Sequence, residues 1–251
     1  MVVGRVAALR RHPVKSMQGL EVDRVAVGVG GIEGDRQRAC IDEGTSRIMS
    51  AKRFGRLLEA SADDEGITLP GGRRLTYGDP EVDQVLSGWM GRRVRLEERS
   101  PDLQRSYEMT FEPPNDDAEY VEIPSPPGTY LDLAAVHLLS TATLAGGEAA
   151  HGDLDWDVRR FRPNLVVEGP EEPFAEDAWC GSELTVGGAR LAVRQPTVRC
   201  AMPLRAQPGL ARQPRLYRAL EALHANHLGT YVDVVEPGEI RVGDDVVVAS
   251  R

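Results

Sequence analysis

The sequence predicts a mainly β protein, built from β-barrels with a few added helices. Three observations predict this class: many short segments alternate apolar and polar residues, few segments have a helical pattern, and glycine turns separate the strands. The chain has 251 residues, of which 41% are hydrophobic. It is therefore long enough to bury a substantial core, as one large domain or two smaller ones.

The first part of the chain, residues 1–98, is expected to be mostly strands. Residues 2–10 and 20–27 alternate in the manner of half-buried strands, and a glycine-rich turn leads to a third strand over 35–42. Those glycines do not open a helix, so a phosphate-binding loop is only weakly indicated there. The expected helices are 51–60 and 79–90.

Residues 99–129 are expected to be a long surface connection or insertion, because the stretch is rich in proline and acidic residues without a regular period. Residues 101–157 hold 12 acidic side chains and one basic one, whereas the whole chain has a net charge of −9. Such a chain is a poor general nucleic-acid binder. The acidic segment is a solvated face, an insertion or a docking surface for a basic partner.

The last part, residues 130–251, returns to short strands. The stretch 130–139 contains an apolar run and precedes a short helix that Ser140, Thr141 or Thr143 can cap. Residues 158–168 are predicted as a strand interrupted at Pro163. A hairpin is expected over 184–194, and then a proline-broken loop. The remaining expected elements are a helix over 214–226 and strands over 228–235, 239–242 and 245–249.

The bulk features favour a cytoplasmic protein without a membrane segment. No apolar stretch approaches the roughly 20 residues that a membrane-spanning helix requires, and the first residues lack the pattern of a signal peptide. The three cysteines, Cys40, Cys180 and Cys200, are too few and too widely spaced for a disulfide framework or a paired-cysteine metal site.

The stretch around Cys200 is the candidate reactive centre. Pro196 and Pro203 frame a loop in which Arg199 precedes the thiol. A cation beside a thiol favours the thiolate, which is the form that ligates metals and attacks electrophiles. The alternative is a buried cysteine that acts as a small hydrophobe. A catalytic pair with His137 is also open, as is a metal site at His224 and His227 near a helix end.

Four basic positions are candidates for binding an anion, since each lies at a strand end or loop next to glycine or proline. They are Lys15 (followed by Ser16), Arg36, Arg162 and Arg199. A phosphate requires several donors that converge, and guanidinium groups suit this geometry. Isolated surface arginines are the alternative for each position.

Six motifs occur together along the chain, and their order matches one family. They are HPVKSMQG (12–19), GIEGDR (31–36), FRPNLVV (161–167), PFAEDAW (173–179), PTVRC (196–200) and PGEIRVGD (237–244). In these motifs the chain resembles MOSC proteins, named after the C-terminal domain of molybdenum cofactor sulfurase, with their N-terminal β-barrel region. Among them it is most similar to the type related to the mitochondrial amidoxime reducing component. The resemblance implies an N-terminal barrel over 1–98, a connection over 99–129 and a MOSC domain over 130–251.

The resemblance also implies a molybdenum–molybdopterin cofactor, and at family level pyridoxal phosphate binding. By motif matching, Cys200 is the catalytic thiol and the ligand to molybdenum, for which thiolate is a suitable donor. The residues implied to bind the cofactor are Lys15, Ser16, Arg36, Ser140, Thr141, Arg162, Asn164 and Arg199.

The implied activity is reduction of N-hydroxylated or other N- or S-oxygenated small molecules. Electrons would come from a separate ferredoxin- or cytochrome-like protein, since three cysteines cannot hold a four-cysteine iron–sulfur cluster. Met17 and the segment after Cys200 depart from the family pattern, which affects the substrate assignment more than the cofactor assignment. The alternatives are a sulfur or cofactor carrier that uses Cys200 without turnover, and a ligand-binding barrel with a structural Cys200.

Overall fold

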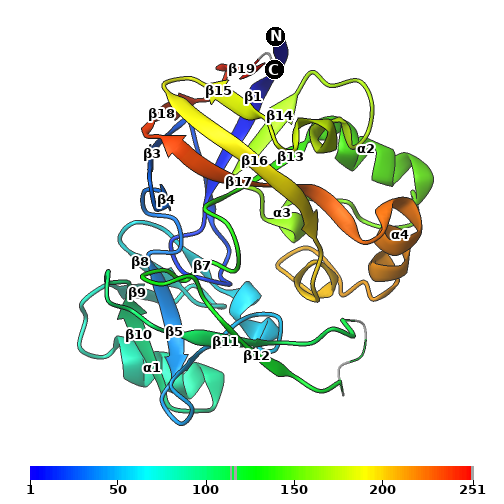
Figure 1. Ribbon diagram of the computed structural model, residues 1–251. Helices are drawn as coiled ribbons and strands as arrows, with labels where there is room; N and C mark the ends of the chain where they lie inside the picture. Colours follow the sequence, from blue (N-terminus) through cyan, green and yellow to red (C-terminus); the bar gives the residue numbers. More distant parts are fainter. Residues whose placement is uncertain (114, 116–117, 250–251) are drawn as a thin grey trace.

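The computed structural model describes residues 1–113, 115 and 118–249. Figure 1 shows two parts, a barrel that carries both chain ends and a second set of smaller sheets at the opposite end of the molecule. The predicted mainly β class with a few helices is confirmed. None of the helices in the described residues is long and apolar enough to cross a membrane.

The barrel closes through the first strand of the chain. In the described residues its strands run in the order β14-β13-β17-β16-β15-β19-β1, and β1 pairs again with β14. Alternate residues of β16 (Ala189, Leu191 and Val193) are buried, as expected of a strand with one face in the barrel core. The bounds are β1 Val2–Arg11, β13 Val136–Ser140, β14 Leu165–Glu168, β15 Glu183–Val186, β16 Ala189–Val198, β17 His227–Glu236 and β19 Asp245–Val248.

The second part follows β1 and its partner β2 (Leu20–Val22), and contains two smaller sheets, with the orders β10-β5-β6-β11-β12 and β7-β8-β9. A buried cluster that includes Leu57, Leu58, Ile67 and Leu86 fills its interior. A third small sheet, β18-β3-β4, joins a late strand to the early chain and packs on the barrel core through Val25, Val27, Ile32 and Ile240. The bounds are β3 Arg24–Gly28, β4 Gly31–Ile32, β5 Arg38–Asp42, β6 Arg47–Ile48, β7 Ser61–Ala62, β8 Gly66–Thr68, β9 Arg74–Thr76, α1 Val82–Met90, β10 Val94–Glu98, β11 Ser106–Met109, β12 Val121–Pro124 and β18 Gly238–Arg241.

The prediction of one interrupted strand over 158–168 is wrong in its first half. Asp157 caps a short helix, α3 (Val158–Phe161), by accepting a hydrogen bond from the Arg159 amide at 2.8 Å. Arg162 then adopts a left-handed backbone with φ 55°, and only 165–168 forms a strand. Because Pro163 cannot donate to a ladder, it lies in the connection between the two.

Other expectations also differ from the structure. The loop expected at Pro196 is the end of β16, which absorbs the proline through register shifts against β17. The connection over 99–129 contains the β11–β12 hairpin, while its residues 114, 116 and 117 lie outside the described part. The helix expected over 51–60 is a 3-10 helix at Gly55–Glu59.

Helices lie along one side of the barrel (Figure 1). Ser140 caps α2 (Thr141–Ala150) by accepting from the Thr143 amide at 3.1 Å, as one of the predicted caps. The predicted helix over 214–226 is α4 (Arg215–His224), which begins after Pro214. Two more 3-10 helices occur at Ala175–Trp179 and Met202–Leu204.

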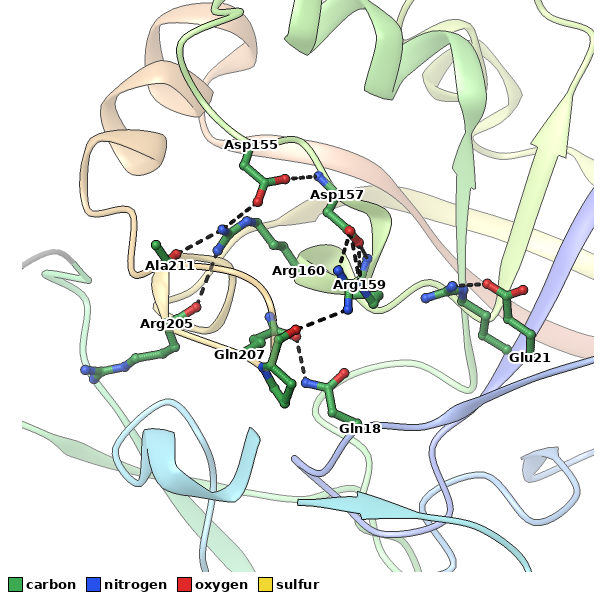
Figure 2. Close-up of polar contacts among 11 residues, drawn as sticks. Gln18, Glu21, Asp155, Asp157, Arg159, Arg160, Arg205, Gln207 and Ala211 are labelled. Atoms are coloured by element: carbon green, nitrogen blue, oxygen red, sulfur yellow. Dashed lines mark hydrogen bonds and ion pairs between the residues drawn. The ribbon is translucent and has the colours of Figure 1, made fainter. Parts of the chain in front are cut away.

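The loop that follows Cys200 is held by a buried guanidinium. Figure 2 shows Arg160 of α3 directed at the loop, with hydrogen bonds to the carbonyls of Arg205 (3.4 Å) and Ala211 (2.9 Å) and an ion pair with Asp155 at 3.1 Å. A further bond reaches the Pro203 carbonyl at 3.2 Å. The Arg160 side chain is fully buried, so this loop has its position fixed from inside.

A second contact ties the same loop to the early chain. Gln207 accepts a hydrogen bond from the Gln18 side-chain amide at 2.8 Å (Figure 2). Gln18 lies just after the Lys15–Ser16 segment, and the same amide also donates to the Leu58 carbonyl at 3.0 Å. The residues that follow Cys200 are thus connected to both parts of the molecule.

We expect Arg160→Met to lower the free energy of unfolding by about 3 kcal/mol, since three loop carbonyls lose their donor and each unsatisfied buried group costs roughly 1–3 kcal/mol. The neighbouring Arg159→Met is the control. Arg159 is partly exposed and pairs with Asp157, so its loss should cost under about 1 kcal/mol. Denaturant unfolding of both variants measures the difference, and equal losses would contradict the assignment.

Candidate functional site

The candidate site is a pocket between the barrel and the second part of the chain. Residues from six separated segments line it, and most of the predicted site residues are among them. The pocket brings together Lys15, Ser16, Arg36, Arg162, Asn164, Arg199 and Cys200. Its other walls include Asp132, His137, Phe161, Thr197 and Tyr231. The convergence that a phosphate site requires is therefore present in the structure.

Three of the lining residues have strained backbones. Ser16, Arg36 and Arg162 adopt φ angles of 69°, 46° and 55°, although none is glycine. Such conformations cost on the order of 1 kcal/mol each and persist where the surroundings fix them. Here the surroundings are specific: the Ser16 hydroxyl accepts from the Ala51 amide at 2.9 Å, and the Arg36 amide donates to the His12 carbonyl at 2.7 Å. The strain is concentrated at the pocket wall.

Arg162 and Arg199 are buried guanidinium groups that retain unused donors. Arg162 donates to the Met17 carbonyl at 2.8 Å and leaves Nη2 without a partner, whereas Arg199 donates to the Phe161 carbonyl at 2.8 Å and leaves Nε without one. Neither forms an ion pair with a carboxylate of the described residues. Burial, and then the charge of Arg36, lowers the pKa of Arg162 to about 9. Burial also lowers the pKa of Arg199. Both groups would gain from an anionic ligand.

A small polar network fixes Arg36 beside these cations. Asp35 accepts from the His12 amide at 2.7 Å and forms an ion pair with Arg36. Burial alone would raise the pKa of Asp35, but Arg36 and His12 hold it below its usual range. Burial and the charge of Arg162 lower the pKa of His12 to about 3, so this imidazole is neutral at physiological pH. Arg36 also lies 3.4 Å from Oδ1 of Asn164.

His137 also lines the pocket, and its ring lies beside the Arg199 guanidinium. Its Nε2 is 3.5 Å from Arg199 Nη1 and 3.3 Å from the Leu228 carbonyl. Burial, and then the charge of Arg199, lowers the pKa of His137 to about 3. The neutral imidazole therefore contacts the guanidinium of Arg199. Because its pKa is so low, His137 is a weak base, and this does not favour a catalytic pair with Cys200.

Lys15 and Lys52 share one carboxylate. The two ammonium groups lie 2.6 and 2.9 Å from the two oxygens of Asp132, and both lie over the Tyr107 ring, at 5.0 and 4.0 Å from its centroid. Burial, partly offset by Asp132, lowers the pKa of Lys15 to about 8. Two cations on one anion leave this side of the pocket positive while Lys15 is protonated. Lys15 also donates to the Tyr130 carbonyl at 2.5 Å.

Sequence reasoning missed Lys52 and Asp132. One signal was available, because Lys15 and Lys52 are the two lysines of the entire chain, and both lie in the same ion cluster. Asp132 had no comparable signal, since it is one of twelve acidic residues in the segment 101–157 and its partners are more than 70 residues away in sequence.

Cys200 is the second residue after the end of β16 and forms part of the pocket wall. Two hydrogen bonds hold its neighbour: the Arg199 amide donates to the Asn226 carbonyl at 2.9 Å, and the Asn226 side chain donates to the Arg199 carbonyl at 2.8 Å. Cys200 is partly exposed. By contrast Cys40 is fully buried, and burial raises the pKa of its thiol to about 12.

The structure does not bring Ser140 and Thr141 to this pocket. The Ser140 hydroxyl is buried beneath α2 and donates to Glu176 at 2.8 Å, while Thr141 is exposed on the first turn of that helix. His224 pairs with Asp177 at 2.5 Å. Within the described residues, no group of three or more histidine, cysteine or acidic side chains is arranged to hold a metal ion.

Comparison with known proteins agrees with this architecture. Two family descriptions match the chain: MOSC N-terminal beta barrel domain over residues 3–81, and MOSC domain over residues 127–247. A search of curated proteins finds no significant match. Among solved structures, the YUAD protein from Bacillus subtilis has a TM-score of 0.51 and 15% identity over 99% of this chain and 96% of that chain. At this identity the likeness shows the fold alone.

Two further structures are more distant. YiiM from Geobacillus stearothermophilus has a TM-score of 0.39 and 20% identity, covering 61% of this chain and 75% of its own. YiiM from Escherichia coli has a TM-score of 0.35 and 15% identity, covering 49% and 58%. The two family matches together span both parts of the fold, so the chain belongs to the MOSC domain proteins with an N-terminal β-barrel domain, a family linked to molybdenum cofactor binding.

Proposed function

We propose that this protein is a molybdenum-cofactor-dependent oxidoreductase, of the type related to the mitochondrial amidoxime reducing component. It reduces N-hydroxylated or other N- or S-oxygenated small molecules. The observation that carries the proposal is the convergence of buried, incompletely bonded guanidinium groups on a pocket whose wall contains Cys200. The family's link to the molybdenum cofactor supports it.

The residues present fit a molybdopterin-type ligand. Its phosphate needs several converging donors, and Arg162 Nη2 and Arg199 Nε are buried donors without partners. Lys15 and Arg36 add positive charge to the same pocket, and Asn164 accepts from the His137 amide at 3.3 Å, which fixes its amide near Arg36. Cys200 supplies a thiol to the pocket lining, and as a thiolate it is a soft donor that suits a metal with other sulfur ligands.

The proposed reaction removes one oxygen atom with two electrons. For a hydroxylamine, R–NHOH accepts two electrons and two protons and yields R–NH2 and water. When bound, the cofactor supplies the oxygen-atom and electron chemistry. The protein binds the phosphate through its guanidinium groups, holds the thiol in place through Asn226 and the Arg160-anchored loop, and shapes the space beside the thiol. The electrons come from a separate ferredoxin- or cytochrome-like protein.

We expect Cys200→Ala to lower the molybdenum content of protein from a cofactor-producing host at least tenfold, since a thiolate ligand is lost. Cys180→Ala is the matched control because Cys180 is also partly exposed but lies outside the pocket. Elemental analysis measures the metal, and circular dichroism verifies the fold.

Wild-type protein without molybdenum or pterin would refute the proposed function. Full molybdenum retention in Cys200→Ala would refute ligation by this thiol. Stoichiometric cofactor without turnover of any N- or S-oxygenated compound, with a reduced artificial donor, would instead favour a carrier in which Cys200 holds a persulfide or the cofactor.

The positive pocket also predicts pH-dependent anion binding. Sulfate stays a dianion from pH 7 to 10, so it reports only on the charge of the protein. The pKa of Lys15 is lowered to about 8 and that of Arg162 to about 9. Raising the pH through these values removes positive charge, so sulfate affinity for cofactor-free protein should fall, by roughly tenfold for each charge lost.

Isothermal titration calorimetry at constant ionic strength measures this dependence. Arg162→Gln should bind sulfate more weakly at pH 7 and lose less affinity between pH 8 and 10 than the wild type. An affinity that is constant or rises with pH would contradict the assignment of these two groups to the anion site.

A further inference from the structure

A second cavity adjoins the pocket on the other side of Cys200. We call it the vestibule. It shares with the pocket a wall that comprises Asp132, Leu133, Val198, Arg199, Cys200 and Tyr231. Its remaining lining comes from Lys52, from the β11–β12 hairpin, and from helix α4 with Asn226 just after it. In Figure 1 the hairpin and the helix belong to opposite parts of the molecule. The vestibule therefore forms only when both parts are assembled.

The side chains of the vestibule are mainly rings and apolar groups. Tyr107, Met109 and Phe111 come from the hairpin side. Tyr217 comes from α4, and Tyr231 from β17. Aromatic pairs contribute about 0.5–1.5 kcal/mol beyond the burial of their area. This lining differs from that of the anion pocket, whose walls carry four cationic side chains.

The vestibule mouth also exposes large apolar side chains. Phe111 is 71% exposed, Val198 48% and Leu133 47%, and all three line this cavity. Clustered exposed apolar groups at a concave site indicate a ligand or partner surface, unlike single exposed residues. Since Cys200 lies on the inner wall of the same cavity, a small molecule held by these groups is next to the thiol.

The charged groups of the vestibule have partners once the anion pocket is filled. Lys52 and Asp132 pair with each other at 2.9 Å. Arg199 donates to the Phe161 carbonyl, and under the proposed function its unused Nε donor binds the phosphate in the adjoining anion pocket. Burial raises the pKa of Tyr231 to about 12, and it also raises the pKa of Tyr107, so both phenols are neutral at physiological pH. In the cofactor-loaded protein, a carboxylate or ammonium group that enters the vestibule would therefore lose hydration without gaining a free counter-ion.

We propose that the vestibule is the substrate-binding subsite and takes a flat, uncharged aromatic or heteroaromatic molecule, with the ring against Phe111 and Tyr217 and the N-oxygenated group toward Cys200. This inference rests on the proposed function and narrows its substrate class. Phe111 is a specificity-determining residue for the reaction.

Three substrates test the inference on the molybdenum-loaded enzyme with reduced methyl viologen under anaerobic conditions. Phenylhydroxylamine is flat and uncharged, 4-(hydroxyamino)benzoate adds a carboxylate, and hydroxylamine lacks the ring. We expect kcat/KM for phenylhydroxylamine to exceed the other two by about tenfold or more, the equivalent of about 1.4 kcal/mol.

Phe111→Ala separates ring binding from chemistry. It should raise KM for phenylhydroxylamine about fivefold to tenfold, and lower the ratio of kcat/KM for phenylhydroxylamine to kcat/KM for hydroxylamine by a similar factor, with rates expressed per bound molybdenum. The variant should fold, because Phe111 is largely exposed. Val29→Ala is the control, since Val29 is 76% exposed and lies outside both cavities. It should behave as the wild type with all three substrates.

A binding measurement distinguishes the two proposals. Saturation-transfer NMR with aniline, the expected product, should show contact with wild-type protein that weakens in Phe111→Ala and persists in Val29→Ala. If the protein lacks molybdenum but aniline contact depends on Phe111, the proposed reduction fails and the aromatic subsite stands. If molybdenum is present but the three substrates react alike and Phe111→Ala changes nothing, the subsite is refuted and the proposed function stands.

Discussion

Arg162 and Arg199 are two buried guanidinium groups that have no carboxylate partner in the described part of the chain, and they determine how the rest of this site is built. Removing an ionised group from water is costly unless other groups solvate it, so each arginine is held by a backbone carbonyl, at Met17 and Phe161. Two of the adjoining side chains, His12 and His137, are imidazoles that burial and the neighbouring arginines keep neutral. Rigid supports are necessary here, because a mobile guanidinium would move toward a carboxylate or toward water. The barrel and the short helix α3 provide that rigidity.

The site depends on both parts of the chain at once. Lys15 and Arg36 belong to the early segment, whereas Arg162, Asn164 and Cys200 belong to the later one. Hydrogen bonds across the boundary, such as Gln18 to Gln207 and Arg162 to Met17, hold the two sets in register. The two family descriptions that match the chain therefore correspond to one shared site rather than to two independent modules.

Much of the strand content could be predicted, because alternation of apolar residues reports directly on a half-buried strand. Residues 2–10 and 184–194 illustrate this. Local capping was harder to foresee. The Asp157 side chain accepts a hydrogen bond from the Arg159 amide and caps a helix where a strand was expected, at 158–161. The basic residues of the site were recognised as candidates, but their convergence depends on tertiary packing. Ser140 shows the reverse error, since its motif position suggested the cofactor while its hydroxyl caps α2 and contacts Glu176.

The place of β1 has a consequence for how the molecule is made. Val2 pairs with Val247, and the same strand pairs with β14, so the barrel needs its first and its last strands together. During synthesis, the part of β1 that pairs with β19 stays without this partner until residues 245–248 have left the ribosome. Pairing of strands that lie more than 200 residues apart in sequence is slow, and unpaired strand edges can pair with other chains and aggregate. Assembly of this protein should therefore be limited by the last strand to emerge, and it should benefit from chaperones that shield the first.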